Sequence, residues 1–251
     1  MSPEARLDAG TLARLDRLTD GVPYTHPPVC HLLYRLVRGI DRPRVVEVSC
    51  AYGKATAYLA AAAAERHGSV RAMDLVEHRW QDRTARQVVA DADPTGCCQI
   101  DLGVDARWWL LDLLAESPDQ WIDLAYLDAT HTVEVDAFLA STLWRHIRPG
   151  GLLIVDDLDW VPRTHGDPAT EYSRPDRSHV RALFDYLAEL DDVAESLEWG
   201  RDRVGWSWGF VRKAGGTEAS LAEMIAAAAP AKPRRSWRDV LRALRSRKRP
   251  R

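Results

Sequence analysis

The stretch 45–64 constrains the fold more than any other part of the chain. It begins with an apolar run of strand type that contains one acid, Glu47, and continues into a short turn that closes on Gly53. The alanine-rich segment that follows, 54–67, predicts a helix. A strand, a glycine turn and a helix form the half of a Rossmann-type unit in which backbone N–H groups at the helix N-terminus bind an anionic ligand. We therefore expect a nucleotide-like ligand at this turn.

The position of a second acid sharpens this expectation. Asp74 ends the next apolar stretch, 69–75, and lies 21 residues after Gly53. An acid about 20 residues beyond the turn, at the tip of the second strand, is placed to accept hydrogen bonds from ribose hydroxyls. A dinucleotide-binding turn favours the pattern G-x-G-x-x-G, whereas this turn contains one glycine. The pattern therefore argues against a dehydrogenase.

Segments of strand character and helix character alternate along the chain. The predicted strands are 44–49, 69–75, 98–102, 122–128, 152–157, 193–199 and 205–212, and the predicted helices are 3–18, 28–39, 54–67, 78–92, 106–115, 133–147 and 178–190. Strands separated by helices predict an α/β fold with a Rossmann-like, doubly wound sheet. The short turn 200–203 between the two final strands predicts an antiparallel hairpin. We expect seven strands, mostly parallel, with the last one antiparallel.

The bulk composition agrees with one α/β domain and flanking segments. The chain has 251 residues, of which 46% are hydrophobic and 28% charged. No apolar run approaches 18 residues, and the first residues lack a signal-peptide pattern, so we expect no transmembrane segment. On the same grounds we expect a cytoplasmic protein. The four cysteines lack zinc-site spacing and are expected to be reduced. The expected parts are N-terminal helices (1–40), the sheet domain (41–213) and a basic helical appendage (214–251).

Charge is distributed unevenly along the chain. The segment 230–251 contains ten Lys or Arg residues and a single acid, Asp239, so it carries a charge of +9 while the rest carries −12, which gives the total of −3. Such a basic tail is compatible with RNA binding. A helix expected around Trp237 has one apolar face that could pack on the body, pair with another chain in a homodimer, or contact an anionic membrane surface.

Acidic residues end four of the predicted strands or follow them directly. Glu47, Asp74 and Asp128 belong to the first, second and fourth strands, and Asp156 and Asp157 end the fifth. In a doubly wound sheet, ligands bind outside the carboxyl ends of the strands. The last three aspartates would repel one another there unless a cation neutralised them, and hard oxygen ligands suit Mg²⁺. Aspartates that only cap loops are the alternative.

These motifs resemble those of known methyltransferases. The turn from Glu47 to Gly53 is similar to the E-x-G-x-x-x-G motif of class I S-adenosylmethionine-dependent methyltransferases. The sequences D-A-T-H at 128–131 and D-D-L-D-W at 156–160 resemble D-A-D-K and D-N-V-L-W of metal-dependent catechol and caffeoyl-CoA O-methyltransferases. They also resemble the motifs of methyltransferase family 24, in which the first of the two motifs often reads D-G-D-H. The resemblance implies a class I methyltransferase domain at 41–213.

The same resemblance implies site residues. The metal ligands would be Asp128, Asp156 and Asp157, and His131 would replace the catalytic lysine as general base. The implied contacts to S-adenosylmethionine come from the turn, the second strand and the segments after the third and fourth strands: Glu47, Ser49, Ala51, Tyr52, Gly53, Thr56, Asp74, Asp105 and Asp128. The N-terminal helices would cap this site.

The expected function is divalent-metal-assisted O-methylation of a small molecule. The acceptor would be a catechol, a vicinal diol or a sugar hydroxyl, as in natural-product biosynthesis. An RNA methyltransferase is the first alternative and rests on the basic tail, although no N-P-P-Y-type motif is present. The second alternative is a cofactor-binding protein without catalysis. It rests on Ser49 in place of the first glycine of the motif and on Ala55 in place of a serine.

Overall fold

The computed structural model describes residues 3–93, 95–116, 121–128, 130–165, 176–216 and 219–229. Its main sheet has seven strands in the order β5-β2-β1-β6-β7-β9-β8. All neighbours pair in parallel except β9, which is antiparallel to both β7 and β8. The strands are β1 (Arg44–Val48), β2 (Ser69–Asp74), β5 (Cys98–Leu102), β6 (Ile122–Leu127), β7 (Ile147–Val155), β8 (Val193–Trp199) and β9 (Trp208–Lys213). The predicted fold class, including the reversed last strand, is confirmed.

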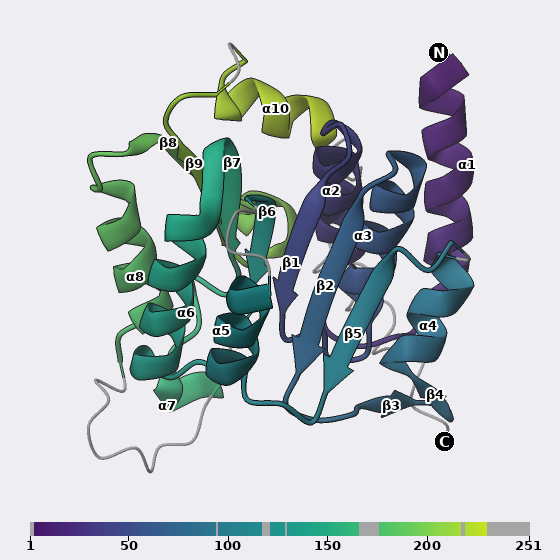
Figure 1. The fold of residues 1–251 in the computed structure, drawn as a ribbon, viewed down its shortest axis with the longest axis horizontal. Coiled ribbons are helices and arrows are strands. Elements are labelled where there is room, and N and C mark those ends of the chain that lie inside the picture. The colour runs from purple at the N-terminus through teal and green to yellow at the C-terminus, as the bar shows by residue number, and fades with distance from the viewer. Residues whose placement is uncertain are drawn as a thin grey trace, which may run out of the picture.

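Helices cover both faces of this sheet (Figure 1). The first face carries α1 (Pro3–Leu18), α2 (Pro27–Arg38), α3 (Lys54–Glu65) and α4 (Ala85–Ala92). The second face carries α5 (Ala106–Glu116), α6 (Val133–His146) and α8 (His179–Ala188). None of the helices in the described ranges is both long enough and apolar enough to cross a lipid bilayer.

Alternation along the strands divides the core into two clusters. Val45 of β1 packs with the α2–α3 side, whereas its neighbour Val46 packs with α5 and α6. In β6, Tyr126 and Leu127 divide in the same way. Successive side chains of a strand point to opposite faces, so strands that are apolar throughout are buried on both sides. This is why β6, whose residues are apolar except for Asp123, is buried along its whole length.

The predicted helix 78–92 is wrong in its first half. Residues 79–84 form a short antiparallel hairpin of β3 (Arg79–Trp80) and β4 (Arg83–Thr84), and the helix begins only at Ala85. Thr84 fixes that start because its hydroxyl accepts a hydrogen bond from the backbone of Gln87, whose side chain accepts one from the backbone N–H of Thr84. A reciprocal cap of this kind defines the N-terminus more sharply than the apolar periodicity does.

Three other boundaries also differ from the expected ones. The predicted turn 200–203 is a short helix, α9 (Arg201–Val204), and β9 begins at Trp208 instead of at residue 205. The strand β7 begins at Ile147, earlier than the predicted 152. A further short helix, α7 (Pro162–His165), lies in the long segment after β7.

The C-terminal segment begins with a helix that packs on the body. This helix, α10 (Leu221–Ala228), buries Leu221, Ile225 and Ala228 in the core of the first face. The Arg35 guanidinium donates a hydrogen bond to the carbonyl of Ala228 at 2.8 Å. In Figure 1, α10 lies at the top, whereas the arrows of β1, β2 and β5 point down to the opposite edge of the sheet. The helix expected around Trp237 and the basic tail lie outside the described residues.

Candidate active site

A cavity of about 490 Å³ opens at the carboxyl edge of the sheet. It is bordered by the turn after β1, the end of β2, the segments after β6 and β7, the loop between α1 and α2, and the residues before β9. Seven of the residues predicted from sequence line it: Ser49, Ala51, Asp74, Asp128, His131, Asp156 and Asp157. The cavity therefore joins the expected cofactor turn to the expected metal and base residues.

The turn after β1 has a strained backbone. Ser49 has a φ of 68° and Ala51 a φ of 45°, both in the left-handed region that glycine occupies most easily. Gly53 has a φ of 79°, and a Cβ atom added there would lie 2.9 Å from the carbonyl oxygen of Ala85. Ser49, which replaces the first glycine of the motif, thus keeps the backbone conformation that a glycine would adopt.

Asp74 is held at the tip of β2 by backbone groups. Its Oδ2 accepts a hydrogen bond from Ala51 N at 2.7 Å, and its Oδ1 accepts one from Val76 N at 3.0 Å. The side chain is buried but borders the cavity. Each carboxylate oxygen can accept a further hydrogen bond, so the fixed carboxylate keeps acceptor capacity for hydroxyl groups.

Two other predicted cofactor residues are fully buried. Glu47 and Thr56 have no exposed surface. Burial raises the pKa of Glu47 to about 8, the neighbouring Thr56 side chain opposes this shift, and the nearby carboxylate of Asp74 adds to it. Glu47 is therefore a largely neutral carboxylic acid near pH 7.

The remaining predicted cofactor residues lie around the turn and at the start of α5. Tyr52 stacks on Tyr24 at a centroid distance of 5.5 Å and packs against His78 at 5.1 Å. Tyr24 is 70% exposed and has a positive φ of 67°. Asp105 does not line the cavity, and its carboxylate pairs with Arg107 at 2.6 Å.

The three predicted metal ligands border the cavity together. Oδ2 of Asp156 accepts a hydrogen bond from the Tyr126 hydroxyl, and its Oδ1 accepts one from the backbone N–H of Asp157 at 2.6 Å. Burial and the neighbouring carboxylates raise the pKa of Asp128 and Asp156 well above the usual value for an aspartate. A bound cation would reverse this effect, because it favours the charged form of each carboxylate. The chemistry of these donors therefore fits a divalent metal ion.

His131 approaches the same carboxylates from the segment after β6. Its Nε2 lies 3.1 Å from Oδ2 of Asp157, and its ring stacks on Trp160 at 4.7 Å. One ligand atom each from Asp128, His131 and Asp157 lies within 4.8 Å of the others. This group of donor atoms therefore includes His131 and leaves out Asp156, which also lines the cavity.

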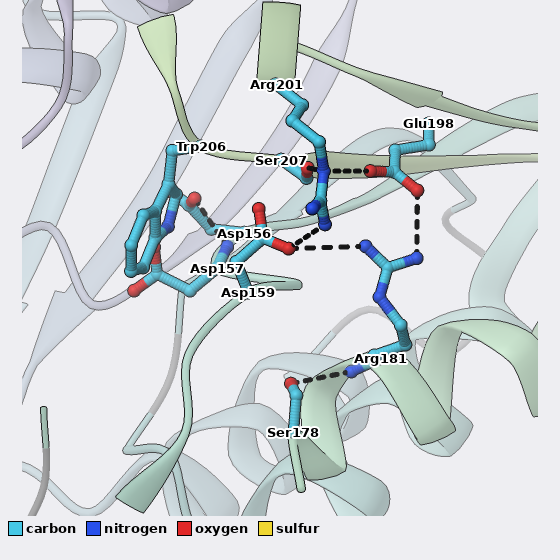
Figure 2. A network of polar contacts seen from close by, with 9 residues as sticks. All are labelled: Asp156, Asp157, Asp159, Ser178, Arg181, Glu198, Arg201, Trp206 and Ser207. Atoms are coloured by element: carbon cyan, nitrogen blue, oxygen red, sulfur yellow. Dashed lines mark hydrogen bonds and ion pairs between the residues drawn. The ribbon is translucent and has the colours of Figure 1, made fainter. Parts of the chain in front are cut away.

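A polar network fixes the segment that carries Asp157 (Figure 2). The indole N–H of Trp206 donates to Oδ1 of Asp157. Next to this pair, Arg201 bonds to Asp159, to Glu198 and to the Ser207 hydroxyl. Arg181 pairs with Glu198 at 2.8 Å and with Asp159 at 3.6 Å, which links the network to α8. The segment after β7 is thus held by α8, β8 and the residues around α9.

Strained backbone is concentrated around this cavity. Nine non-glycine residues in the described ranges have a positive φ, and five of them line the cavity: Tyr24, Ser49, Ala51, His131 and Asp157. Such conformations cost about 1–3 kcal/mol each and are found mostly at functional sites. The distribution therefore supports a functional role for this cavity on grounds that do not depend on any motif.

Sequence reasoning missed several lining residues. His78, Trp206 and Trp208 line the cavity, but no motif marks them. His26 lies in the Tyr24–Pro27 segment between the N-terminal helices, and it also lines the cavity. Burial lowers its pKa, the Lys54 ammonium adds to that shift, and Asp157 opposes it. Of the long segment 159–179, residues 166–175 lie outside the described residues.

Comparison with known proteins agrees with this description. Residues 46–158 match the family model described as a methyltransferase domain, family 24. A trans-aconitate 2-methyltransferase from Azoarcus sp. (strain BH72) is 28% identical over 135 residues, which are 53% of this chain and 45% of that protein. The chain thus spans less than half the length of this curated relative.

Two solved structures share the fold. The O-methyltransferase TomG from Streptomyces achromogenes, involved in tomaymycin synthesis and in complex with S-adenosylmethionine, has a TM-score of 0.59 and 19% identity. The structural alignment covers 86% of this chain and 100% of the TomG chain. MycE from the mycinamycin biosynthetic pathway, in complex with Mg, S-adenosylhomocysteine and mycinamycin VI, has a TM-score of 0.54 and 15% identity, and covers 84% of this chain and 56% of its own.

The seven-stranded sheet with its reversed strand is the fold that these solved methyltransferase structures share. The stretch 46–158, which matches the methyltransferase-domain model, contains the turn after β1, Asp74 and the carboxylates after β6 and β7. The resemblance to methyltransferases that the motifs predict is therefore confirmed over residues 46–158.

Proposed function

We propose that this protein transfers the methyl group of S-adenosylmethionine to a hydroxyl oxygen of a small molecule. The observation that carries the proposal is that one cavity joins Asp74 to a cluster of Asp128, Asp157 and His131. The first residue suits the ribose of the cofactor, and the cluster suits activation of a hydroxyl group.

In this proposal the cofactor lies across the turn after β1. Asp74 binds the ribose hydroxyls, and the left-handed backbone of Ser49 and Ala51 brings the chain close to the methionine part. The turn itself is supported by Glu47, Tyr52, Gly53 and Thr56. Asp105 is proposed to bind the adenine amino group. Asp128 is proposed to contact the cofactor from the segment after β6. The solved structure of TomG with S-adenosylmethionine supports this use of the fold.

A divalent metal ion, proposed to be Mg²⁺, would be held by Asp128, Asp156 and Asp157. When bound, such an ion makes an acceptor hydroxyl more acidic and fixes its orientation. The crowded carboxylates support this proposal, as does the magnesium in the MycE complex. Two of these aspartates also contact protein donors, so the segment that carries them is rigid before any ligand binds.

His131 acts as the general base. The acceptor O–H proton moves to Nε2 of His131 while the oxygen attacks the methyl carbon in line with the departing sulfur. The C–S bond breaks as the O–C bond forms, which leaves S-adenosylhomocysteine, a methyl ether and an imidazolium. Asp157, 3.1 Å from Nε2, stabilises the imidazolium that results.

The acceptor is proposed to be a catechol, a vicinal diol or a sugar. Trp160, Trp206, Trp208, His26 and Tyr24 line the cavity, and such rings pack well against planar or pyranose rings. In this proposal residues 1–40 cap the site, which the position of Tyr24 and His26 at the cavity supports.

Calorimetry with S-adenosylhomocysteine tests the cofactor part of the proposal. Asp74→Ala should weaken binding by about 1.5–3 kcal/mol, the usual size of a hydrogen bond to a charged group. Asp93→Ala is the matched control, because Asp93 is also buried and accepts backbone hydrogen bonds, from Thr95 and Cys97. Equal affinities of Asp74→Ala and the wild type would refute the assignment. Methyl transfer to 3,4-dihydroxybenzoate, with and without Mg²⁺, then tests the reaction.

A further inference from the structure

A histidine lies beside the carboxylate that is proposed to bind the cofactor ribose. His78 is the fourth residue after Asp74, the last residue of β2, and both side chains border the same cavity. Nε2 of His78 lies 3.7 Å from Oδ1 of Asp74. That distance is too long for a direct hydrogen bond, but one oxygen atom can bridge it. The two side chains therefore leave a place for a single oxygen between them.

This gap is wider than in comparable pairs elsewhere in the chain. In the other pairs of a histidine and an aspartate in the described ranges, the ring nitrogen lies 2.8–3.1 Å from the carboxylate oxygen: His31 with Asp16, His179 with Asp136, and His131 with Asp157. Those pairs are in direct contact. The pair at the tip of β2 is the one that leaves room for a third atom.

The two side chains offer one acceptor and one donor to an oxygen in this gap. Asp74 is the acceptor, and the backbone N–H groups of Ala51 and Val76 fix its carboxylate. A neutral histidine carries one N–H group, and the carboxylate next to Nε2 favours the proton on that nitrogen. A hydroxyl group can donate its proton to Asp74 and accept a hydrogen bond from His78. An anionic oxygen has no proton to donate and would be repelled by Asp74, so the pair suits a hydroxyl group.

Aromatic rings hold His78 in this position. The ring of Tyr52, in the turn after β1, packs against His78 at a centroid distance of 5.1 Å. Tyr24 stacks on Tyr52 at 5.5 Å, and Trp80 of β3 meets Tyr52 edge to face at 6.3 Å. A side chain that is already packed loses little conformational freedom when it binds a ligand. His78 is therefore prepared to bind before any ligand arrives.

We propose that His78 is a second ribose-binding residue, which donates its Nε2–H group to the same ribose hydroxyl that donates its proton to Asp74. The inference rests on the proposed function, because it requires the cofactor ribose to lie at Asp74. Since both hydrogen bonds meet on one oxygen atom, the removal of His78 and the removal of that hydroxyl have coupled effects on affinity.

Calorimetry with S-adenosylhomocysteine and the full-length protein tests the assignment without turnover. His78→Leu, which removes the donor and keeps a side chain of similar size, should weaken binding by about 3–10-fold, the usual effect of one hydrogen bond. His78→Gln, whose amide can donate from about the position of Nε2, should retain most of the affinity. His67→Leu is the matched control, because His67 is an exposed histidine just before β2, at the opposite edge of the sheet. Equal affinities of His78→Leu and the wild type would overturn the proposal.

Analogues that lack one ribose hydroxyl separate a direct contact from a general loosening of the site. The 2′-deoxy and 3′-deoxy forms of S-adenosylhomocysteine are titrated into the wild type and into His78→Leu. For one of the two hydroxyls, its deletion should cost the wild type about 3–10-fold more affinity than it costs His78→Leu, where the partner is already missing. A purely structural role of His78 would give equal losses in both proteins for both analogues, and that result would contradict the proposal.

A crystal structure of the wild type with S-adenosylhomocysteine gives a measurement that does not depend on how a variant folds. Nε2 of His78 within about 2.7–3.2 Å of a ribose hydroxyl oxygen supports the proposal. A ribose bound at Asp74 with His78 turned away would overturn it and leave the proposed function intact. A wild type that does not bind S-adenosylhomocysteine would instead refute the proposed cofactor site, and the role of His78 with it.

Discussion

Nε2 of His131 lies 3.1 Å from Oδ2 of Asp157, although the two residues follow different strands and each has a left-handed backbone. His131 follows β6, and Asp157 follows β7, the next strand in the sheet. Their contact therefore depends on the parallel pairing of these strands. It places a base and a carboxylate at one point of the cavity, and the first prediction concerns this pair.

Replacing His131 by alanine should lower kcat by about 10²–10⁴-fold, the usual contribution of a general base. Affinity for S-adenosylhomocysteine should change little, since the cofactor is proposed to bind at the turn after β1. His131→Lys should recover part of the rate at higher pH. His146→Ala is the control on the same side of the sheet, because His146 ends α6 and does not line the cavity. Near-normal kcat in His131→Ala from about pH 6 to 9 would mean that the base lies elsewhere.

Metal binding should require Asp157 and should release protons. Titration of metal-free protein with Mn²⁺, followed by electron paramagnetic resonance, should show at least about tenfold weaker binding in Asp157→Asn. Since burial and the neighbouring carboxylates raise the pKa of Asp128 and Asp156, binding should be weaker at acid pH, where these groups keep their protons. Asp93→Asn is the matched control, because Asp93 is a buried aspartate that accepts backbone hydrogen bonds from Thr95 and Cys97 and does not line the cavity. Equal affinities of the two variants would refute the metal site.

Trp206→Phe should weaken Mn²⁺ binding by roughly tenfold, because it removes the indole donor that orients Asp157. The phenyl ring keeps most of the packing, so the loss of stability should stay near 1 kcal/mol. Trp199→Phe provides the comparison. The indole nitrogen of Trp199 has no hydrogen-bond partner in the described part of the chain, so no bond is lost there. If both variants bind Mn²⁺ like the wild type, the contact with Trp206 does not orient a ligand.

Glu47→Gln should change how stability depends on pH. The folded protein keeps the Glu47 proton up to a pKa of about 8, while the unfolded chain releases it near 4.5. The stability associated with the neutral acid is therefore fully present below about pH 4.5 and is lost as the pH rises through 8. Glutamine stays neutral, so the variant should gain on the wild type with rising pH, by up to a few kcal/mol at about 1.4 kcal/mol per pKa unit. Urea unfolding of the ligand-free proteins at pH 5 and pH 8.5 measures this, and parallel behaviour would show that Glu47 is ionised when buried.

Gly53→Ala should destabilise the protein by more than 1–2 kcal/mol and weaken binding of S-adenosylhomocysteine. The left-handed φ of 79° alone costs an alanine about 1–2 kcal/mol, and the new methyl group would also lie 2.9 Å from the Ala85 carbonyl oxygen. Gly96→Ala isolates the first term, because Gly96 has a φ of 74° and its Cβ would meet no atom within 4 Å. Equal losses of unfolding free energy in the two variants would mean that the contact with Ala85 relaxes at no cost.

The sequence by itself determined the α/β sheet and the positions of its acids. Apolar runs such as 152–155 are buried on both sheet faces, which the absence of polar alternation indicates directly. Because parallel strands end at the same edge, Asp74, Asp128 and Asp156 could be assigned to one site from their places at strand ends alone. Local caps were harder to see. The helix predicted from residue 78 begins only at Ala85, because the reciprocal hydrogen bonds of Thr84 and Gln87 cap it there. The apolar periodicity does not show such a cap.

Only the tertiary structure decided which side chains complete the site. Trp206 reaches Asp157 because β9 is inserted antiparallel between β7 and β8, so the residues before it return to the carboxyl edge. Asp136 and His179 meet because α6 and α8 pack on one sheet face, and no spacing in the sequence predicts that contact. Strand-end residues are placed by backbone pairing, which repeats along the chain and can be predicted. Contacts between separate helices and loops depend on how whole side chains pack, and that is settled only when the complete fold forms.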